Sequence, residues 1–201
     1  MQQERERNAN MTIAARLRHW CGALVMLACV AAAGCAATPN DAPVLEQLDS
    51  ETGMTIARLG RPIELYRETP LQDAAVRFAF LGPFETNRMG TRDLFLWIAV
   101  PVEFVSGAAT PVVTVNDVPL ALGVPGRDAE FAGLRATPYR LPTPWSTTWY
   151  FKVDADTIAR LGESSRISVR VPEAARDGTL TATEFIVELK DEPRLREFAH
   201  R

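Results

Sequence analysis

Most of the chain after residue 44 consists of short segments in which apolar and polar residues alternate, separated by Gly, Pro, Asn or Asp. In residues 145–153, for example, Trp149 and Phe151 share one face, while Tyr150 and Lys152 face the other way. Alternation with a period of two predicts strands that have one buried face. The segments with this pattern are residues 54–59, 63–68, 74–80, 111–115, 118–122, 145–153, 166–171 and 181–190.

Residues 92–105 differ from these segments because they are apolar on both faces. A strand of that composition is expected in the centre of a sheet, covered on both sides. Pro101 cannot donate a hydrogen bond to a neighbouring strand, so we expect a bend or a sheet edge there. Residues 87–90, Asn-Arg-Met-Gly, predict a turn, and residues 116–117, Asn-Asp, predict a two-residue hairpin loop. Residues 60–62, Gly-Arg-Pro, predict another hairpin between the alternating segments on either side of them.

Two short helices are expected beside the strands. Asp154 or Asp156 can cap a helix that runs through Leu161, with Gly162 as its left-handed stop. Asp191 is expected to cap a second helix at the C-terminus. Each helix is short, so both are expected to decorate the sheets rather than form a layer of their own.

About eight strands with one polar face each favour an all-β fold of two packed sheets, an immunoglobulin-like or related sandwich. The paired cysteines of antibody domains are missing, so the likeness concerns the architecture alone. We expect one domain over residues 44–201, because about 160 residues are enough to bury a single core.

The first 34 residues have the organisation of a secretory signal peptide. Arg16 and Arg18 precede an apolar run over residues 20–34. These fifteen residues are fewer than the roughly 20 that a helix needs to cross a bilayer, and they match the apolar region of a leader. Acidic residues before Met11 fit a leader poorly, so translation is expected to start at Met11.

The leader ends in Ala32-Ala33-Gly34-Cys35, which resembles the lipobox of bacterial lipoproteins. The resemblance implies that Cys35 is acylated on sulfur and becomes the first residue of the mature chain. Leu is usual where Ala32 stands. Residues 31–37 also offer an ordinary small-residue cleavage site, so a plain cleaved leader remains the alternative. Cleavage before Cys29 is a poorer fit, since it would expose apolar residues at the new N-terminus.

Residues 35–43 would then form a lipidated tether, because their composition of small, polar and Pro residues is typical of an extended linker. Two or more acyl chains on one residue hold a protein on a membrane stably, whereas a single chain does so only reversibly. The family resemblance further implies outer-membrane sorting, because Ala36 rather than Asp follows the cysteine. We therefore expect a lipid anchor at the periplasmic face of the outer membrane.

Composition excludes several function classes. Removing residues 1–34, which hold four Arg and two Glu, moves the formal charge from −3 to −5. An acidic domain is a poor partner for nucleic acid, which requires a basic face. The other two cysteines leave with the leader, so after lipidation of Cys35 no thiol remains for a disulfide, a metal site or a nucleophile. We expect no metal and no cofactor.

Catalytic residues are scarce as well. His200, next to the C-terminus, is the only histidine after the leader, which argues against a Ser-His-Asp triad or a histidine zinc site. Two acidic pairs, Asp154 with Asp156 and Asp128 with Glu130, are spaced for acid-base work on a glycan. Helix capping explains the first pair more simply, and solvated loop charge explains the second. We identify no catalytic constellation.

Residues 123–145 form the most unusual segment, because more than twenty residues pass without alternation. Connections of this length in a compact domain are often functional. The segment is rich in residue types that dominate binding hot spots, and the alternative is that it folds over the sandwich and buries its aromatic side chains. The candidate binding residues are Arg127, Phe131, Arg135, Tyr139, Arg140 and Trp145.

Three functions are therefore open. The first is a non-enzymatic envelope module that binds another envelope protein through an edge strand or through residues 123–145. The second is a periplasmic binder of carbohydrates or small ligands that uses the aromatic and Arg side chains of residues 123–149. The third is an acid-base hydrolase of cell-wall sugars. Residues 51–68 and 80–90 also resemble a signature of proteobacterial lipoproteins with no assigned activity, which implies no particular role.

Overall fold

The computed structural model describes residues 44–67, 78–102, 105, 109–141, 144–174, 180–189 and 192–201. Cys35, the leader and the tether lie outside these residues. The described strands are β1 (Val44–Asp49), β2 (Met54–Leu59), β3 (Ile63–Arg67), β4 (Phe78–Arg88), β5 (Thr91–Pro101), β6 (Val112–Val115), β7 (Val118–Pro119), β8 (Ser146–Val153), β9 (Arg166–Ala174) and β10 (Leu180–Glu188). Helices α2 (Ala155–Gly162) and α3 (Pro193–Ala199) and a 3-10 helix, η3 (Ala129–Ala132), complete the described elements.

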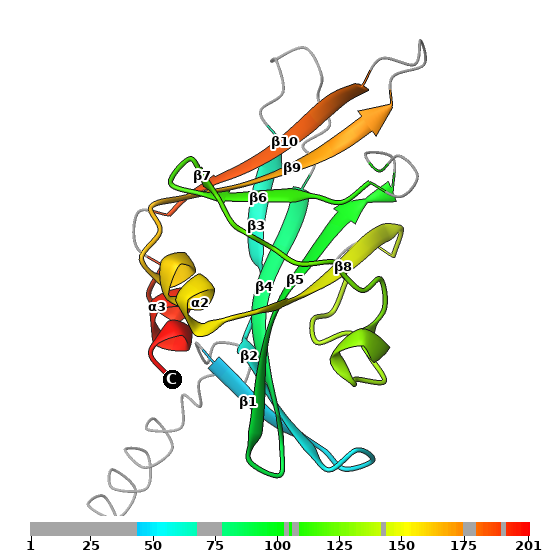
Figure 1. Cartoon of the computed structure of the whole chain (residues 1–201), viewed down its shortest axis with the longest axis vertical. Helices are drawn as coiled ribbons and strands as arrows, with labels where there is room; N and C mark the ends of the chain where they lie inside the picture. Colours follow the sequence, from blue (N-terminus) through cyan, green and yellow to red (C-terminus); the bar gives the residue numbers. More distant parts are fainter. Residues whose placement is uncertain are drawn as a thin grey trace, which may run out of the picture. The chain divides into compact units, whose positions relative to one another are not determined.

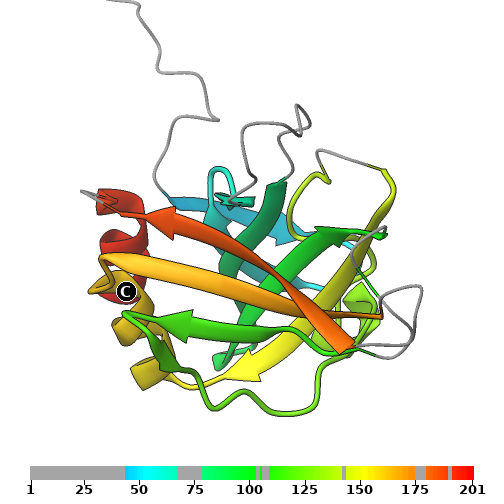
Figure 2. The same cartoon turned by 90° about the horizontal axis from the view of Figure 1, so that it is seen from above.

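The strands form one antiparallel sheet that folds back on itself. Its order is β1-β2-β4-β3-β10-β9-β6-β7, and β5 and β8 extend from the other edge of β4. The layer of β6, β9 and β10 crosses over the layer that contains β4, β5 and β8 (Figure 2). Helices α2 and α3 lie side by side at one end of the layers (Figure 1). The prediction of an all-β, sandwich-like fold with short helices is confirmed.

The core lies between the two layers. The apolar residues that alternate along the strands form this core, because every second residue of a strand points inward. Leu81, Ile98 and Trp149 come from one layer and Val169 and Phe185 from the other, and each is fully buried. The central β5 is covered on both faces, as its composition predicts: Trp97 and Ile98 point in opposite directions and both are buried.

Two predicted turns are confirmed, and their backbone shows why. Asn116 and Asp117 connect β6 to β7 with φ angles of 48° and 64°. The β4–β5 hairpin turns at Met89 and Gly90, with φ angles of 51° and 90°. In a two-residue hairpin loop, positive φ at both central residues gives the loop a twist that matches the right-handed twist of the flanking strands.

The hairpin predicted at residues 60–62 is wrong. Strands β2 and β3 do not pair with each other; instead they lie end to end along the same edge of β4. Thr55 is opposite Asn87 and Ile63 is opposite Leu81, so two extra residues separate the two registers. Residues 60–62 are thus a bulge within one long strand, and such bulges bend a strand without reversing it.

Helix α2 begins as predicted and ends differently. The Asp154 carboxylate accepts a hydrogen bond of 2.8 Å from the Thr157 N–H and caps the helix. Gly162 is not a left-handed stop, since it belongs to the last turn and Glu163 follows with φ −93°. A Cβ atom on Gly162 would lie 2.6 Å from the Cβ of Ala199, so the glycine allows α3 to pack closely. Asp191, the cap expected for α3, lies outside the described residues.

Candidate functional site

The long connection after β7 covers the face of β4, β5 and β8 that points away from the core. It is fastened to β8 by two backbone hydrogen bonds of 2.9 Å between Gly126 and Tyr150. Within it, Asp128 caps η3 by accepting a hydrogen bond of 3.2 Å from the Phe131 N–H. Tyr150, which the alternation directs outward, is buried under this connection. The sandwich therefore has a third, irregular layer on one side.

Tyr139 is the residue of this connection that enters the structure most deeply. Its ring packs on Trp97 with 5.2 Å between centroids, and its side chain is fully buried. The hydroxyl donates a hydrogen bond to the Pro83 carbonyl and accepts one of 3.2 Å from the Leu59 N–H. It thus links β2 to β4 where the bulge interrupts their pairing. Burial raises the pKa of Tyr139 far above its usual value, so the hydroxyl stays protonated.

Gly82 makes room for this tyrosine. A Cβ at that position would lie 2.3 Å from the Tyr139 ring, a distance that no side chain tolerates. The Arg58 guanidinium lies over the same ring, 5.6 Å from its centroid. Tyr139 therefore packs against both the backbone of β4 and a cation, which is a structural role.

The other five candidate binding residues lie on the surface and do not come together. Arg127 covers the Trp149 ring at 4.7 Å and donates to the Ala109 carbonyl at 3.1 Å. Arg135 forms an exposed ion pair of 2.7 Å with Glu51. Trp145, 59% exposed, precedes β8. The remaining two, Phe131 and Arg140, each line a different surface hollow.

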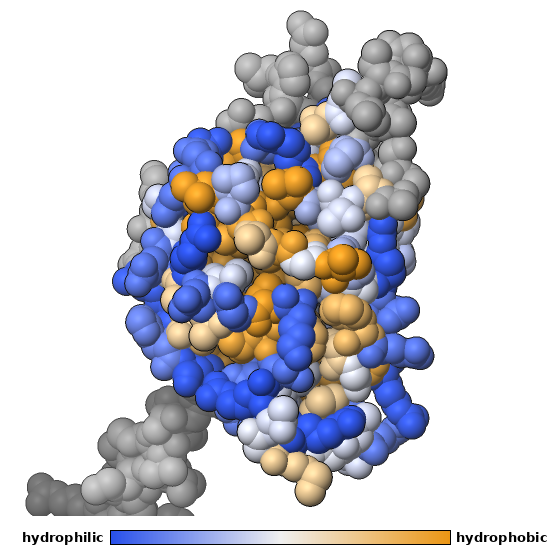
Figure 3. Space-filling model, viewed as in Figure 1, coloured by the Kyte–Doolittle hydropathy of each residue, from blue (hydrophilic) through white to orange (hydrophobic). Residues whose placement is uncertain are grey.

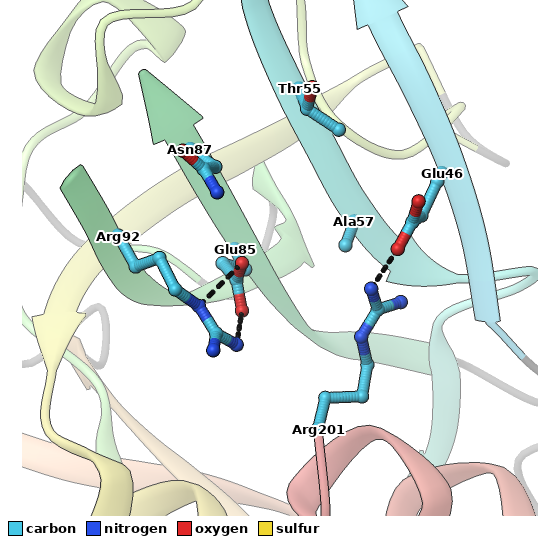
Figure 4. Close-up of a pocket in the computed structure, with 7 residues that line it drawn as sticks. All are labelled: Glu46, Thr55, Ala57, Glu85, Asn87, Arg92 and Arg201. Atoms are coloured by element: carbon cyan, nitrogen blue, oxygen red, sulfur yellow. Dashed lines mark hydrogen bonds and ion pairs between the residues drawn. The ribbon is translucent and has the colours of Figure 1, made fainter. Parts of the chain in front are cut away.

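The first hollow is polar and lies at the C-terminus of the chain (Figure 4). It measures about 430 Å³ and has two arginine–carboxylate pairs on opposite sides. Arg92 binds Glu85 through two hydrogen bonds of 2.9 and 2.5 Å, and Arg201 binds Glu46. The hydrogen bonds to Glu85 raise the pKa of Arg92. Both carboxylates, Glu85 and Glu46, are paired with guanidinium groups. The hollow therefore suits the binding of a polar group better than acid-base catalysis by two carboxylates.

A second hollow of about 480 Å³ lies beside η3. The Phe131 ring meets Phe95 edge to face at 6.4 Å, and the residue lines the hollow and is 44% exposed. An ion pair of 2.6 Å between Lys152 and Asp93 lies on its wall. An aromatic ring beside charged hydrogen-bonding groups is an arrangement that suits a sugar or another small polar ligand.

A third hollow of about 490 Å³ surrounds the bulge between β2 and β3. Among the described residues that line it are three arginines, Arg58, Arg61 and Arg140, and one carboxylate, Glu64. Sequence reasoning picked out Arg140 and missed the other two arginines. The feature of the sequence that could have indicated this hollow is the Gly-Arg-Pro of residues 60–62, which we interpreted as an ordinary hairpin loop.

Other features bear on chemistry within the described parts of the chain. No three His, Cys, Asp or Glu side chains gather there as metal ligands would. His200 is exposed at the end of α3. None of the helices described combines the length and the apolar character that crossing a bilayer requires. Asp154 and Asp128, each from one of the acidic pairs, serve as helix caps.

No protein-family model, curated protein or solved structure matches this chain.

Proposed function

We propose that this chain is a lipid-anchored, non-enzymatic protein of the bacterial envelope that acts as an interaction module at the periplasmic face of the outer membrane. The observation that supports the proposal is the apolar run of the sequence that ends in Ala32-Ala33-Gly34-Cys35 and precedes one compact unit, residues 39–201. Acyl chains on Cys35 would hold the domain at the membrane without any protein segment crossing it. The anchor needs no cofactor.

The domain offers an apolar surface that suits a protein partner. Val112 on β6, Val118 on β7 and Val124 beyond β7 are 45%, 54% and 88% exposed. Apolar residues gather over β6, β7 and β8, with hydrophilic residues around them (Figure 3). An apolar area with a polar rim is typical of an interaction site. The partner we propose is another envelope protein.

Crosslinking in intact cells followed by co-purification tests this proposal. The variant carrying Val118→Glu and Val124→Glu should lose the crosslinked partner, because two charges would be buried at the contact. Met89→Glu is the matched control: Met89 is 98% exposed and lies at the β4–β5 turn, so the same change there should leave the partner bound. Recovering no partner, while the purified protein cleaves a glycan, would refute the proposal.

The anchor itself is tested by mass spectrometry of the mature protein. We expect an N-terminal Cys35 carrying two or three acyl chains. An unmodified N-terminus within residues 31–37 would instead show an ordinary cleaved leader and a protein free in the periplasm.

A small-ligand binder is the second candidate, favoured by the partly exposed Phe131 ring that lines the same hollow as the Lys152–Asp93 ion pair. Titration with peptidoglycan fragments and other glycans, followed by calorimetry, measures such binding. Phe131→Ala should abolish the heat of binding while Trp145→Ala leaves it unchanged. Equal binding by the native protein and the Phe131 variant would exclude this hollow.

A further inference from the structure

The hollow beside η3 has a floor that three neighbouring strands provide. Thr86 of β4 is opposite Asp93 of β5, and Phe95 of β5 is opposite Lys152 of β8. Arg88 lies two residues beyond Thr86 and therefore belongs to the same face of the sheet. All five residues line the hollow. The pairing of the strands thus brings apolar, hydroxyl and charged groups together on one face.

The 3-10 helix η3 adds an aromatic ring to this floor. Phe131 is 44% exposed and meets Phe95 edge to face at 6.4 Å. Its ring offers a flat apolar surface against which the C–H groups of a sugar ring can pack. The hollow measures about 480 Å³, which lies within the range of about 300 to 1,000 Å³ that is usual for small-molecule sites.

Arg88 differs from the other cations in this part of the sheet. The Lys152 ammonium forms an ion pair of 2.6 Å with Asp93 in the same hollow. The Arg92 guanidinium forms one of 2.5 Å with Glu85 in the first hollow. Arg88 is exposed, and within the described parts of the chain no carboxylate forms an ion pair with it. Its guanidinium group can therefore bind an anionic ligand.

We propose that the hollow beside η3 binds a sugar that carries a carboxylate, such as a uronic acid. This inference deepens the second candidate function and rests on it. Phe131 packs against the sugar ring, and Arg88 holds the carboxylate through paired, charge-assisted hydrogen bonds. Lys152 and Asp93 supply a donor and an acceptor for the sugar hydroxyls.

A carboxylate fits this hollow better than a phosphate group does. Arg88 provides one positive charge, and the charge of Lys152 is already balanced by Asp93. A phosphate monoester carries about −1.5 to −2 at neutral pH. Part of that charge would remain unpaired near the Asp93 carboxylate, whereas the single charge of a carboxylate is matched by Arg88.

Calorimetric titration of the purified mature protein tests the inference. The probes are methyl glucuronide and methyl glucoside, which differ only in the exocyclic group: a carboxylate in the first and a hydroxymethyl group in the second. The glucuronide should bind about tenfold more tightly, because a hydrogen-bonded charge pair contributes about that much. Added salt should reduce this advantage, since it screens the attraction. The matching galacturonide and galactoside show whether the preference depends on the configuration of the ring.

Three variants assign the preference to its residues. Arg88→Gln should lower the affinity for both uronides to that of the neutral sugars and leave the neutral sugars unaffected. Phe131→Ala should weaken the binding of all four probes. Arg160→Gln, which removes an exposed charge from α2 outside the hollow, should bind like the native protein.

Each contrary result has a distinct meaning. Equal affinity for uronides and neutral sugars, or an unchanged preference in the Arg88 variant, would overturn the inference and leave a binder of neutral sugars. Tighter binding of methyl glucoside 6-phosphate than of the glucuronide would show a phosphate site and overturn it as well. If none of the probes binds, the inference and the second candidate function both fail.

Discussion

The Tyr139 hydroxyl is expected to stabilise the fold, and Tyr139→Phe removes it with little other change. The hydroxyl bridges the Leu59 N–H and the Pro83 carbonyl across the bulge, and both residues are buried. The phenyl ring of the variant would keep the packing on Trp97 but leave one backbone donor and one acceptor without their partner. A buried group left unpaired costs about 1 to 3 kcal/mol, so we expect a loss of about 3 kcal/mol in the free energy of unfolding.

Urea denaturation followed by tryptophan fluorescence measures this loss. The midpoint should fall while the slope stays unchanged, because the surface exposed on unfolding is the same. The melting temperature should fall by about 6 to 12 °C for a domain of this size. Tyr66→Phe is the control: Tyr66 is half exposed at the end of β3, and its variant should stay within about 0.5 kcal/mol of the native protein. A loss below about 1 kcal/mol for Tyr139→Phe would refute the bridging role.

Two further predictions concern the helices. Gly162→Ala should lower the free energy of unfolding by about 1 to 2 kcal/mol, because overpacking against Ala199 outweighs the better helix propensity of alanine. Thermal melts measure this loss, and Gly123→Ala is the control: no atom lies near that position, so the variant should melt almost like the native protein. A Gly162→Ala variant more stable than the native protein would contradict the close packing. Hydrogen bonds from the Thr157 side chain and backbone lower the pKa of Asp154, so the cap contributes stability above the ordinary aspartate pKa and loses it as the pH falls through the lowered value. Asp154→Asn keeps a neutral cap and should flatten this acid limb of the stability–pH curve, and an unchanged limb would show that the cap is not linked to pH.

Most of the strands were predictable because alternation is a local property of the chain; β1 and residues 81–86 of β4 were not among the predicted segments. In a strand with one buried face, the polarity of each residue indicates whether it is buried or exposed, as the buried Ile167 and Val169 of β9 illustrate. Two-residue hairpin loops are equally local, since Asn and Gly tolerate positive φ better than most residues. The cap of α2 belongs to the same class, because Asp154 bonds a residue only three positions away.

The errors arose where a local signal had two outcomes. The Gly-Arg-Pro of residues 60–62 can reverse a chain or widen a strand, and only the pairing with β4 selects the bulge. A glycine such as Gly162 can end a helix or allow a neighbouring helix to pack closely. The position of Ala199 in α3 shows that Gly162 does the second. Tyr150 alternates outward like any surface residue, yet a distant connection covers it.

The sequence alone therefore determined the all-β class and most of the strands, because each depends on residues that are near one another in the chain. The three hollows and the place of Tyr139 were decided by the tertiary structure. Glu46 meets Arg201 across 155 positions, and Tyr139 reaches Leu59 across 80. Such contacts depend on how the sheet folds back on itself, and no local pattern of polarity encodes that path.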